Sequence, residues 1–188
     1  GNGAYASRLW WMLRWLGHDD VAVLDGGMRR WLQLGLPLSD EAPSPLPGNF
    51  AARPRPGMAA SAADVLAASA SPAARLIDAR APERYRGEIE PIDRVAGHVP
   101  GARNHPFATS LDGQGRFLPR AALREALVAS LDGAAPGSTI VYCGSGVTAC
   151  HVLLALEHAG LAGARLYPGS WSEWSADPSR PVATGATP

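Results

Sequence analysis

The second half of the chain alternates short apolar runs with helical patterns, and this alternation constrains the fold more than any other feature. Residues 75–78 (RLID), 138–143 (STIVYC) and 164–167 (ARLY) are runs typical of buried strands. Residues 119–131 carry apolar side chains at helical spacing after a proline, and 147–160 form a second helical pattern that ends at a glycine. Strands that alternate with helices predict an α/β domain around a mainly parallel sheet.

A proline-rich segment precedes this domain. Six prolines lie between Gly35 and Gly57, and the segment has no apolar period. Such a composition is typical of a linker. We therefore divide the chain into an N-terminal part (1–38), a linker (39–57) and a larger domain (58–188).

The N-terminal part repeats the end of the chain. An ungapped shift of 143 positions aligns residues 21–27 (VAVLDGG) with residues 164–170 (ARLYPGS). Because 164–167 is a predicted strand, the alignment predicts a strand at 21–27 as well. The position that matches Cys143 would precede Gly1, so we expect a partial copy of the same fold, truncated within its first domain. Identical residues in the shifted alignment are Gly1 and Gly144, Gly3 and Gly146, Ala6 and Ala149, Leu13 and Leu156, Gly17 and Gly160, Gly26 and Gly169, and Trp31 and Trp174.

Charge and composition exclude several classes of protein. The 17 basic residues, all of them arginine, balance 17 acidic ones without forming a basic stripe, which argues against nucleic-acid or membrane partners. No apolar run approaches the roughly 20 residues of a spanning helix, and the start shows no signal-peptide pattern. Two cysteines do not make a disulfide framework. We expect a cytoplasmic protein with small-molecule or protein partners.

Cys143 follows a predicted strand and opens a loop of small residues, CGSGVT, at the start of a predicted helix. In α/β proteins, ligands bind beyond the carboxyl ends of the strands. Glycines allow successive backbone N–H groups to point at one spot, where a helix N-terminus also stabilises an anion. The nearest anion is the thiolate of Cys143 itself. The pattern therefore predicts a nucleophilic Cys143 in a backbone anion cradle; a buried, inert thiol is the alternative.

Other cysteine chemistries fit the sequence less well. A phosphatase loop needs an arginine six residues after the cysteine to grip the phosphoryl group, and this chain has Ala149 there. Cys150 lies on the predicted helix and is expected to be structural. Zinc ligands at a defined spacing are missing. A cysteine protease needs a histidine base. No local motif selects one among His98, His105, His151 and His158.

Several motifs occur together in the order of a known family. The segments are IDAR, ERYRGEIEP, AGHVPGARNHPF, CGSGVTA and GSWSEW. From about residue 60 to the end, the chain resembles the catalytic domain of two-domain rhodaneses, the thiosulfate and 3-mercaptopyruvate sulfurtransferases. Residues 8–31 are similar to the closing half of the inactive first domain of these enzymes. The resemblance implies a rhodanese-like fold preceded by a partial second copy.

The resemblance also implies a reaction. The Cys143 thiolate takes the sulfane sulfur of 3-mercaptopyruvate or thiosulfate, holds it as a persulfide and passes it to a thiol or to cyanide. No metal or organic cofactor is implied. Arg84 matches the arginine that binds the carboxylate or sulfonate of the donor. The backbone N–H groups that would hold the persulfide belong to Gly144, Ser145, Gly146, Val147 and Thr148.

The loop residues bear on the choice of donor. Family members that prefer thiosulfate carry Arg and Lys after the cysteine, whereas Gly144 and Ser145 resemble the members that prefer 3-mercaptopyruvate. The histidine and aspartate that assist the counterpart of Ser145 would lie before Gly1. A second arginine of the 3-mercaptopyruvate enzymes falls on Asp93, with Arg94 beside it as a substitute after a one-residue shift.

Residues around the expected site are assigned structural roles. Asp78 is expected to anchor a neighbouring loop, Arg80 to be structural and His98 to fix a loop by hydrogen bonding. The incomplete first domain contains an apolar helix within residues 1–34 that lacks the strands it would pack on. We expect this helix to dock on the catalytic domain, to pair with another chain or to belong to a nicked longer protein. The alternative to an active enzyme is a catalytically weak rhodanese-like binding or sulfur-carrier module.

Overall fold

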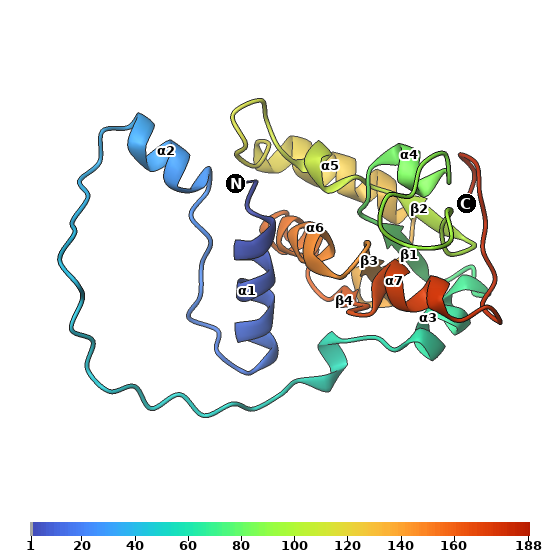
Figure 1. Cartoon of the computed structure of the whole chain (residues 1–188), viewed down its shortest axis with the longest axis horizontal. Coiled ribbons are helices and arrows are strands. Elements are labelled where there is room, and N and C mark those ends of the chain that lie inside the picture. Colours follow the sequence, from blue (N-terminus) through green and yellow to red (C-terminus); the bar gives the residue numbers. More distant parts are fainter. Residues whose placement is uncertain (1) are drawn as a thin grey trace.

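The computed structural model describes residues 2–188; Gly1, and with it the expected pairing of Gly1 with Gly144, lies outside the described residues. The order of elements follows the predicted alternation (Figure 1). Short 3-10 turns are η1 (Pro56–Met58), η2 (Phe107–Ser110) and η3 (Pro136–Ser138). The α-helices are α1 (Ala4–Trp15), α2 (Gly27–Gln33), α3 (Ala62–Ser69), α4 (Pro82–Tyr85), α5 (Arg120–Leu131), α6 (Val147–His158) and α7 (Ser170–Ala176).

The centre of the molecule is a parallel sheet of β1 (Arg75–Asp78), β2 (Ala102–Asn104), β3 (Thr139–Tyr142) and β4 (Arg165–Leu166) in the order β2-β1-β3-β4. Each neighbouring pair is parallel. The predicted α/β fold with a parallel sheet is therefore confirmed, and so are its three predicted strands, within one or two residues of the expected bounds.

Helices cover both faces of the sheet because adjacent strand residues point to opposite sides. Leu76 and Ile140 pack in a cluster with α3 and α7, whereas Ile77 and Val141 pack in a cluster with α1, α5 and α6. Figure 1 shows these two helical layers flanking the strands. Parallel strands that are buried on both faces end at one common edge, and that edge positions the site.

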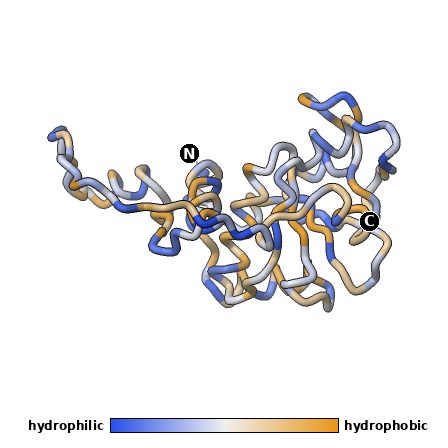
Figure 2. The backbone as a smooth tube through the Cα atoms, turned by 90° about the horizontal axis from the view of Figure 1, so that it is seen from below, coloured by the Kyte–Doolittle hydropathy of each residue, from blue (hydrophilic) through white to orange (hydrophobic). Residues whose placement is uncertain are grey.

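The predicted linker contains no helix or strand between residues 36 and 55. Its side chains are exposed throughout 39–57, and Figure 2 shows the segment extending away from the body of the molecule. It returns at Arg53, whose N–H donates to the carbonyl of Leu16, and at Arg55, which pairs with Asp19. The linker thus reconnects to the main body at the end of α1.

Helix α1 packs against α6, which is the first of the three arrangements expected for this apolar helix. Trp10 and Trp11 are buried in the shared core. The Arg14 guanidinium forms a salt bridge of 2.9 Å with Glu157 on α6. The opposite side of α1 remains exposed, and its large apolar side chains are Tyr5, Leu9 and Met12.

The prediction of a strand at 21–27 is wrong. Val21 and Val23 pack against the core, and the residues between and after them are exposed, which is the alternation of an extended chain. However, no described strand pairs with this segment. A strand is defined by its hydrogen-bonded neighbour, so the apolar pattern alone produces an extended loop here.

Some geometry recurs at the spacing of the sequence repeat. Helices α1 and α6 both have 12 residues, and α2 and α7 both have seven. Gly3 precedes α1 with φ 80° and Gly146 precedes α6 with φ 76°. Each pair of helices starts 143 positions apart. These agreements support the proposal that residues 1–38 are a partial copy of the larger domain.

Candidate active site

The Cys143 loop lies at the carboxyl edge of the sheet, directly after β3. Cys143 is 2% exposed, and its N–H donates to the hydroxyl of Ser170 over 3.2 Å. The N–H groups of Trp171 and Ser172 donate to the carbonyls of Cys143 and Gly144 over 2.9 and 3.0 Å. The start of α7 therefore holds the beginning of the loop in place.

Gly146 ends the loop with a backbone conformation that favours glycine. Its φ is 76°, and a Cβ added here would lie 2.8 Å from the carbonyl oxygen of Pro168. Arg8, on α1, donates from Nη1 to the Gly146 carbonyl over 3.1 Å. The second glycine of the loop is thus required by both its dihedral angle and its surroundings.

The loop presents backbone N–H groups that have no protein partner. Among the hydrogen bonds of residues 2–188, none is donated by the N–H of Gly144, Ser145 or Gly146. Val147 and Thr148 begin α6, where N–H groups have no acceptor within the helix. This arrangement is the one expected of an anion cradle at a helix N-terminus.

A pocket of about 300 Å³ opens at this edge of the sheet. It brings together six of the predicted site residues, and only Gly146 lies outside its lining. The lining also includes residues that the sequence motifs did not indicate, which are Ala79, Ala81, Ile92, Phe107 and Ser172. The predicted residues in the lining are Arg84, Cys143, Gly144, Ser145, Val147 and Thr148.

A larger pocket, of about 460 Å³, lies between α1, α6 and residues 23–28. Its lining includes neither cysteine and neither of the arginines near Cys143. The smaller pocket is therefore the candidate active site on chemical grounds.

Arg84 is held in position by carboxylates rather than left in solvent. It reaches Glu90 from Nη2 to Oε1 over 2.5 Å and from Nε to Oε2 over 3.3 Å. Arg84 forms no salt bridge with the neighbouring Glu83 or Glu88 among the described residues, and Glu88 pairs with Arg86. The third nitrogen, Nη1, faces Gly144, where an added Cβ would be 3.4 Å away. Arg84 therefore directs one donor group at the Cys143 loop.

Burial raises the pKa of Glu90, but hydrogen bonds from Arg84 and from the N–H groups of Asp93 and Ile92 outweigh this effect. The pKa of Glu90 is therefore held below its ordinary value, and the carboxylate stays charged beside Arg84. The same carboxylate accepts from Nη1 of Arg80 over 3.2 Å. One glutamate thus links the two arginines nearest the pocket.

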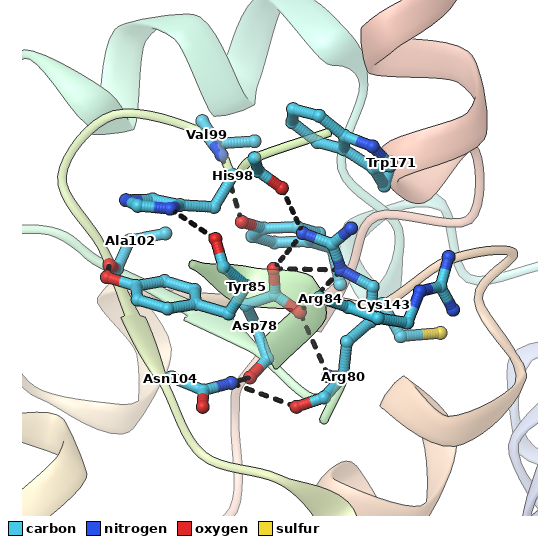
Figure 3. A network of polar contacts seen from close by, with 12 residues as sticks. Asp78, Arg80, Arg84, Tyr85, His98, Val99, Ala102, Asn104, Cys143 and Trp171 are labelled. Atoms are coloured by element: carbon cyan, nitrogen blue, oxygen red, sulfur yellow. Dashed lines mark hydrogen bonds and ion pairs between the residues drawn. The ribbon is translucent and has the colours of Figure 1, made fainter. Parts of the chain in front are cut away.

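Asp78, Arg80 and His98 form a structural network (Figure 3). Arg80 is 3% exposed and donates to Asp78 and to the carbonyl of Gly97, both over 2.6 Å from Nη2. Its guanidinium lies over the Trp171 ring. His98 is fully buried, stacks on Tyr85 and shares a 2.7 Å hydrogen bond with the Tyr85 carbonyl. The expected structural roles are confirmed for all three residues.

The prediction that Arg94 replaces the second arginine of the site is wrong. Arg94 is exposed and does not line the pocket, whereas Asp93 does. Asp93 lies 3.6 Å from Nη2 of Arg84. The Asp93 carboxylate therefore lines the pocket where a second arginine was expected.

Cys150 and Ala149 are both buried on α6. The Cys150 thiol donates to the Gly146 carbonyl over 3.2 Å, and burial raises its pKa to about 12. Cys150 is therefore a neutral, structural thiol at ordinary pH, as predicted. Ala149, at the position of a phosphatase arginine, is fully buried and offers no group to a phosphate.

No histidine among the described residues lines the pocket of Cys143, so a cysteine-protease arrangement is not formed. Burial lowers the pKa of His105 and of His151 to about 4. Ser145 is exposed, and its hydroxyl has no hydrogen bond in residues 2–188. The described residues contain no cluster of three or more metal-ligating side chains.

This combination of a parallel sheet, flanking helices and a cysteine loop at the carboxyl edge defines a rhodanese-like domain. The family model described as "Rhodanese-like domain" matches residues 61–177. The chain belongs to this family. None of the described helices reaches the length and hydrophobicity that a membrane span requires.

Curated relatives carry sulfurtransferase names. The chain is 50% identical over 186 residues to the "Probable 3-mercaptopyruvate sulfurtransferase" of Pseudomonas aeruginosa, covering 98% of this chain and 66% of the relative. It is 38% identical to the "Thiosulfate sulfurtransferase" of Cricetulus griseus, covering 96% of this chain and 62% of that one. The chain thus spans just under two thirds of the length of these relatives.

Among solved structures, one of EanB superimposes with a TM-score of 0.84 and 26% sequence identity, over 96% of this chain and 45% of that chain. That structure is described as a cysteine persulfide in a tetrahedral intermediate state with ergothioneine. The similarity covers almost the whole of the present chain.

Proposed function

We propose that this chain is a sulfurtransferase that moves a sulfane sulfur from 3-mercaptopyruvate or thiosulfate to a thiol or cyanide through a persulfide on Cys143. One observation carries the proposal: Cys143, the unpartnered N–H groups of its loop and Nη1 of Arg84 meet at one pocket. The names of the two relatives support the reaction class. The persulfide in the EanB structure supports the intermediate.

The first half-reaction follows from this geometry. The Cys143 thiolate attacks the sulfane sulfur of the donor, and the bond from that sulfur to the rest of the donor breaks. With thiosulfate the electron pair leaves on sulfite. With 3-mercaptopyruvate it leaves on the enolate of pyruvate, which takes up the thiol proton of the donor to give pyruvate and leaves the persulfide as an anion. Arg84 binds the carboxylate or sulfonate, and the loop N–H groups hold the terminal persulfide anion.

The charges around the pocket favour 3-mercaptopyruvate over thiosulfate. Gly144 and Ser145 add no positive side chain, and the Arg84 guanidinium is already paired with Glu90. A doubly charged donor would therefore meet little uncompensated positive charge, whereas a single carboxylate needs only Nη1 of Arg84.

Replacing Cys143 tests the proposal directly. Cys143→Ser should lower transfer to cyanide from both donors by roughly 10³-fold or more, because it removes the nucleophile. Cys150→Ser is the matched control, since Cys150 is a buried thiol outside the pocket lining. Full activity of Cys143→Ser with both donors would refute the proposal.

A sulfur-carrier module is the second candidate, because Ser145 lacks a hydrogen-bonded partner in the described residues. Intact-mass measurement after incubation with donor separates the two. An enzyme gains one sulfur atom on Cys143 and loses it again when cyanide is added. A carrier also gains the sulfur and yields it to cyanide, but it forms no thiocyanate at a catalytic rate with excess donor, and a binding module gains no sulfur.

Two further expectations belong to the same proposal. Both cysteines are free, which supports a reducing compartment such as the cytoplasm. The exposed apolar side chains of α1 and α2 support self-association through residues 1–38. Gel filtration across a range of concentrations tests this, and a monomer at every concentration would contradict it.

A further inference from the structure

Asp93 is a pocket residue that the proposed reaction does not use. It lines the same pocket as Cys143, and its side chain is 10% exposed. Its Oδ2 atom is enclosed and accepts no hydrogen bond from the described residues. The nearest cationic atom, Nη2 of Arg84, is 3.6 Å away, beyond hydrogen-bonding distance. A buried carboxylate oxygen left in this way normally has a partner.

The protein does not supply that partner because Arg84 is already engaged. Glu90 takes both Nε and Nη2 of Arg84 and also pairs with Arg80, which is in turn bound to Asp78. Around this wall of the pocket, two guanidinium groups therefore face three carboxylates. The excess negative charge lies at Asp93, so a ligand that carries a positive N–H donor would satisfy it.

Neither sulfur donor has such a group. 3-Mercaptopyruvate and thiosulfate offer no ammonium, so the function of Asp93 must be sought in the acceptor half-reaction. An α-amino thiol places a carboxylate and an ammonium on one carbon. The pocket presents Nη1 of Arg84 and the carboxylate of Asp93 as neighbouring and complementary groups. A volume of about 300 Å³ admits a molecule of this size.

We propose that the sulfur acceptor of this pocket is a zwitterionic α-amino thiol such as cysteine, whose carboxylate binds Arg84 and whose ammonium binds Asp93. This inference rests on the proposed sulfurtransferase function. The acceptor thiolate attacks the outer sulfur of the Cys143 persulfide and forms a new sulfur–sulfur bond. The bond to the Cys143 sulfur breaks, its electron pair returns to Cys143 as thiolate, and the acceptor leaves as a persulfide.

Acceptor kinetics test the inference. The probes are L-cysteine and 3-mercaptopropionate, which has a thiol and a carboxylate but no ammonium. The ratio of the kcat/KM value for L-cysteine to that for 3-mercaptopropionate should fall about tenfold in Asp93→Asn, because a charge-assisted hydrogen bond is lost. Differences in thiol reactivity between the probes cancel when wild type and variant are compared. Asp40→Asn, in the exposed linker, is the matched control and should keep the wild-type ratio.

A binding measurement separates this inference from the proposed function. In a Cys143→Ser background, calorimetry should find tighter binding of L-cysteine than of 3-mercaptopropionate, and adding Asp93→Asn should abolish the difference. Asp93→Glu, which keeps the charge, should retain part of it. Equal binding of the two probes, or an unchanged ratio in Asp93→Asn, would overturn the assignment. Absence of transfer to cyanide in the wild type would instead count against the sulfurtransferase proposal.

Discussion

Helices α1 and α2 start 143 positions before α6 and α7, as the proposed repeat requires, yet their burial differs greatly. Seven residues of α6 are buried against four of α1. Helix α7 buries Trp171 and Trp174 completely, whereas α2 buries no residue. Helix α7 packs over the sheet, and α2 lies beside a segment that forms no strand. Burial in this molecule therefore depends on the neighbouring strands as well as on the pattern of each helix.

Comparison of the regions around α1 and α6 also distinguishes glycines with a structural role from the residue expected to react, Cys143. Gly3 and Gly146 have nearly the same φ, and so do Gly17 and Gly160. Only the loop before α6 follows a described strand and carries a cysteine. The glycines thus serve the starts and ends of α1 and α6 alike, and Cys143 makes the loop before α6 the candidate active site.

Replacing Trp174 of α7 and Trp31 of α2, which match in the proposed repeat, should give the largest difference in stability between the two regions. Trp174 is fully buried, and its indole N–H donates to the Pro181 carbonyl. Trp174→Ala should lower the free energy of unfolding by about 3–5 kcal/mol. Trp31→Ala should cost less than about 1 kcal/mol, because Trp31 lies on a helix with no buried residue. Urea denaturation of both variants measures the difference, and equal losses would refute the comparison.

Replacing Gly146 and Gly3, the glycines that precede α6 and α1, by alanine should give the next largest difference in stability. Gly146→Ala combines a positive φ with a contact of 2.8 Å to a backbone oxygen, so we expect a loss of about 2–4 kcal/mol and of sulfur transfer. Gly3→Ala has the same dihedral strain, but its nearest atoms are 3.7 Å away. It should cost about 1–2 kcal/mol. Thermal unfolding combined with a cyanide assay measures both; a Gly146→Ala protein as active as wild type would contradict the assigned role.

The elements that the sequence predicts are those with a local pattern. Apolar runs identify β1, β3 and β4, and the Cys143 loop is visible from its glycines. Strand β2 (ARN) was not predicted, because it is short, contains one buried residue and is held by pairing with β1. The segment 21–27 shows the opposite error, since its apolar pattern meets no partner strand.

The candidate site divides in the same way. Cys143 and its loop are contiguous in sequence, and Arg84 belongs to a recognisable motif. Glu90 lies in the ERYRGEIEP segment and Asp93 just after it, but neither was assigned to the site, because their contacts with Arg84 form only in the folded chain. The chain also exposes Arg94 instead of turning it inward, which sequence spacing does not reveal.

The buried histidine of α6 should give an effect on stability that depends on pH. His151 is the counterpart of Arg8 in α1, and burial lowers its pKa to about 4, below the ordinary value of 6.5. The folded state therefore favours the neutral ring: its stability contribution is present above pH 6.5 and is lost as the pH falls towards 4.

His151→Leu should therefore reduce the loss of unfolding free energy on acidification by up to about 1.4 kcal/mol per pH unit between these values. The measurement is urea denaturation at several pH values. His158→Leu, at an exposed position of the same helix, is the control. A pH dependence like that of wild type in His151→Leu would contradict the prediction.

The salt bridge between the two equivalent helices should have the smallest effect. Arg14 and Glu157 occupy matching positions of the repeat and are 2.9 Å apart, with side chains 25% and 38% exposed. Because solvent screens this pair, a double-mutant cycle with Arg14→Gln and Glu157→Gln should give a coupling of about 0.2–1 kcal/mol that decreases at high salt. The more exposed pair of Arg55 and Asp19 is the control and should couple no more strongly. Zero coupling at low salt would mean that apolar contacts alone, chiefly those of Trp10 and Trp11, hold α1 on α6.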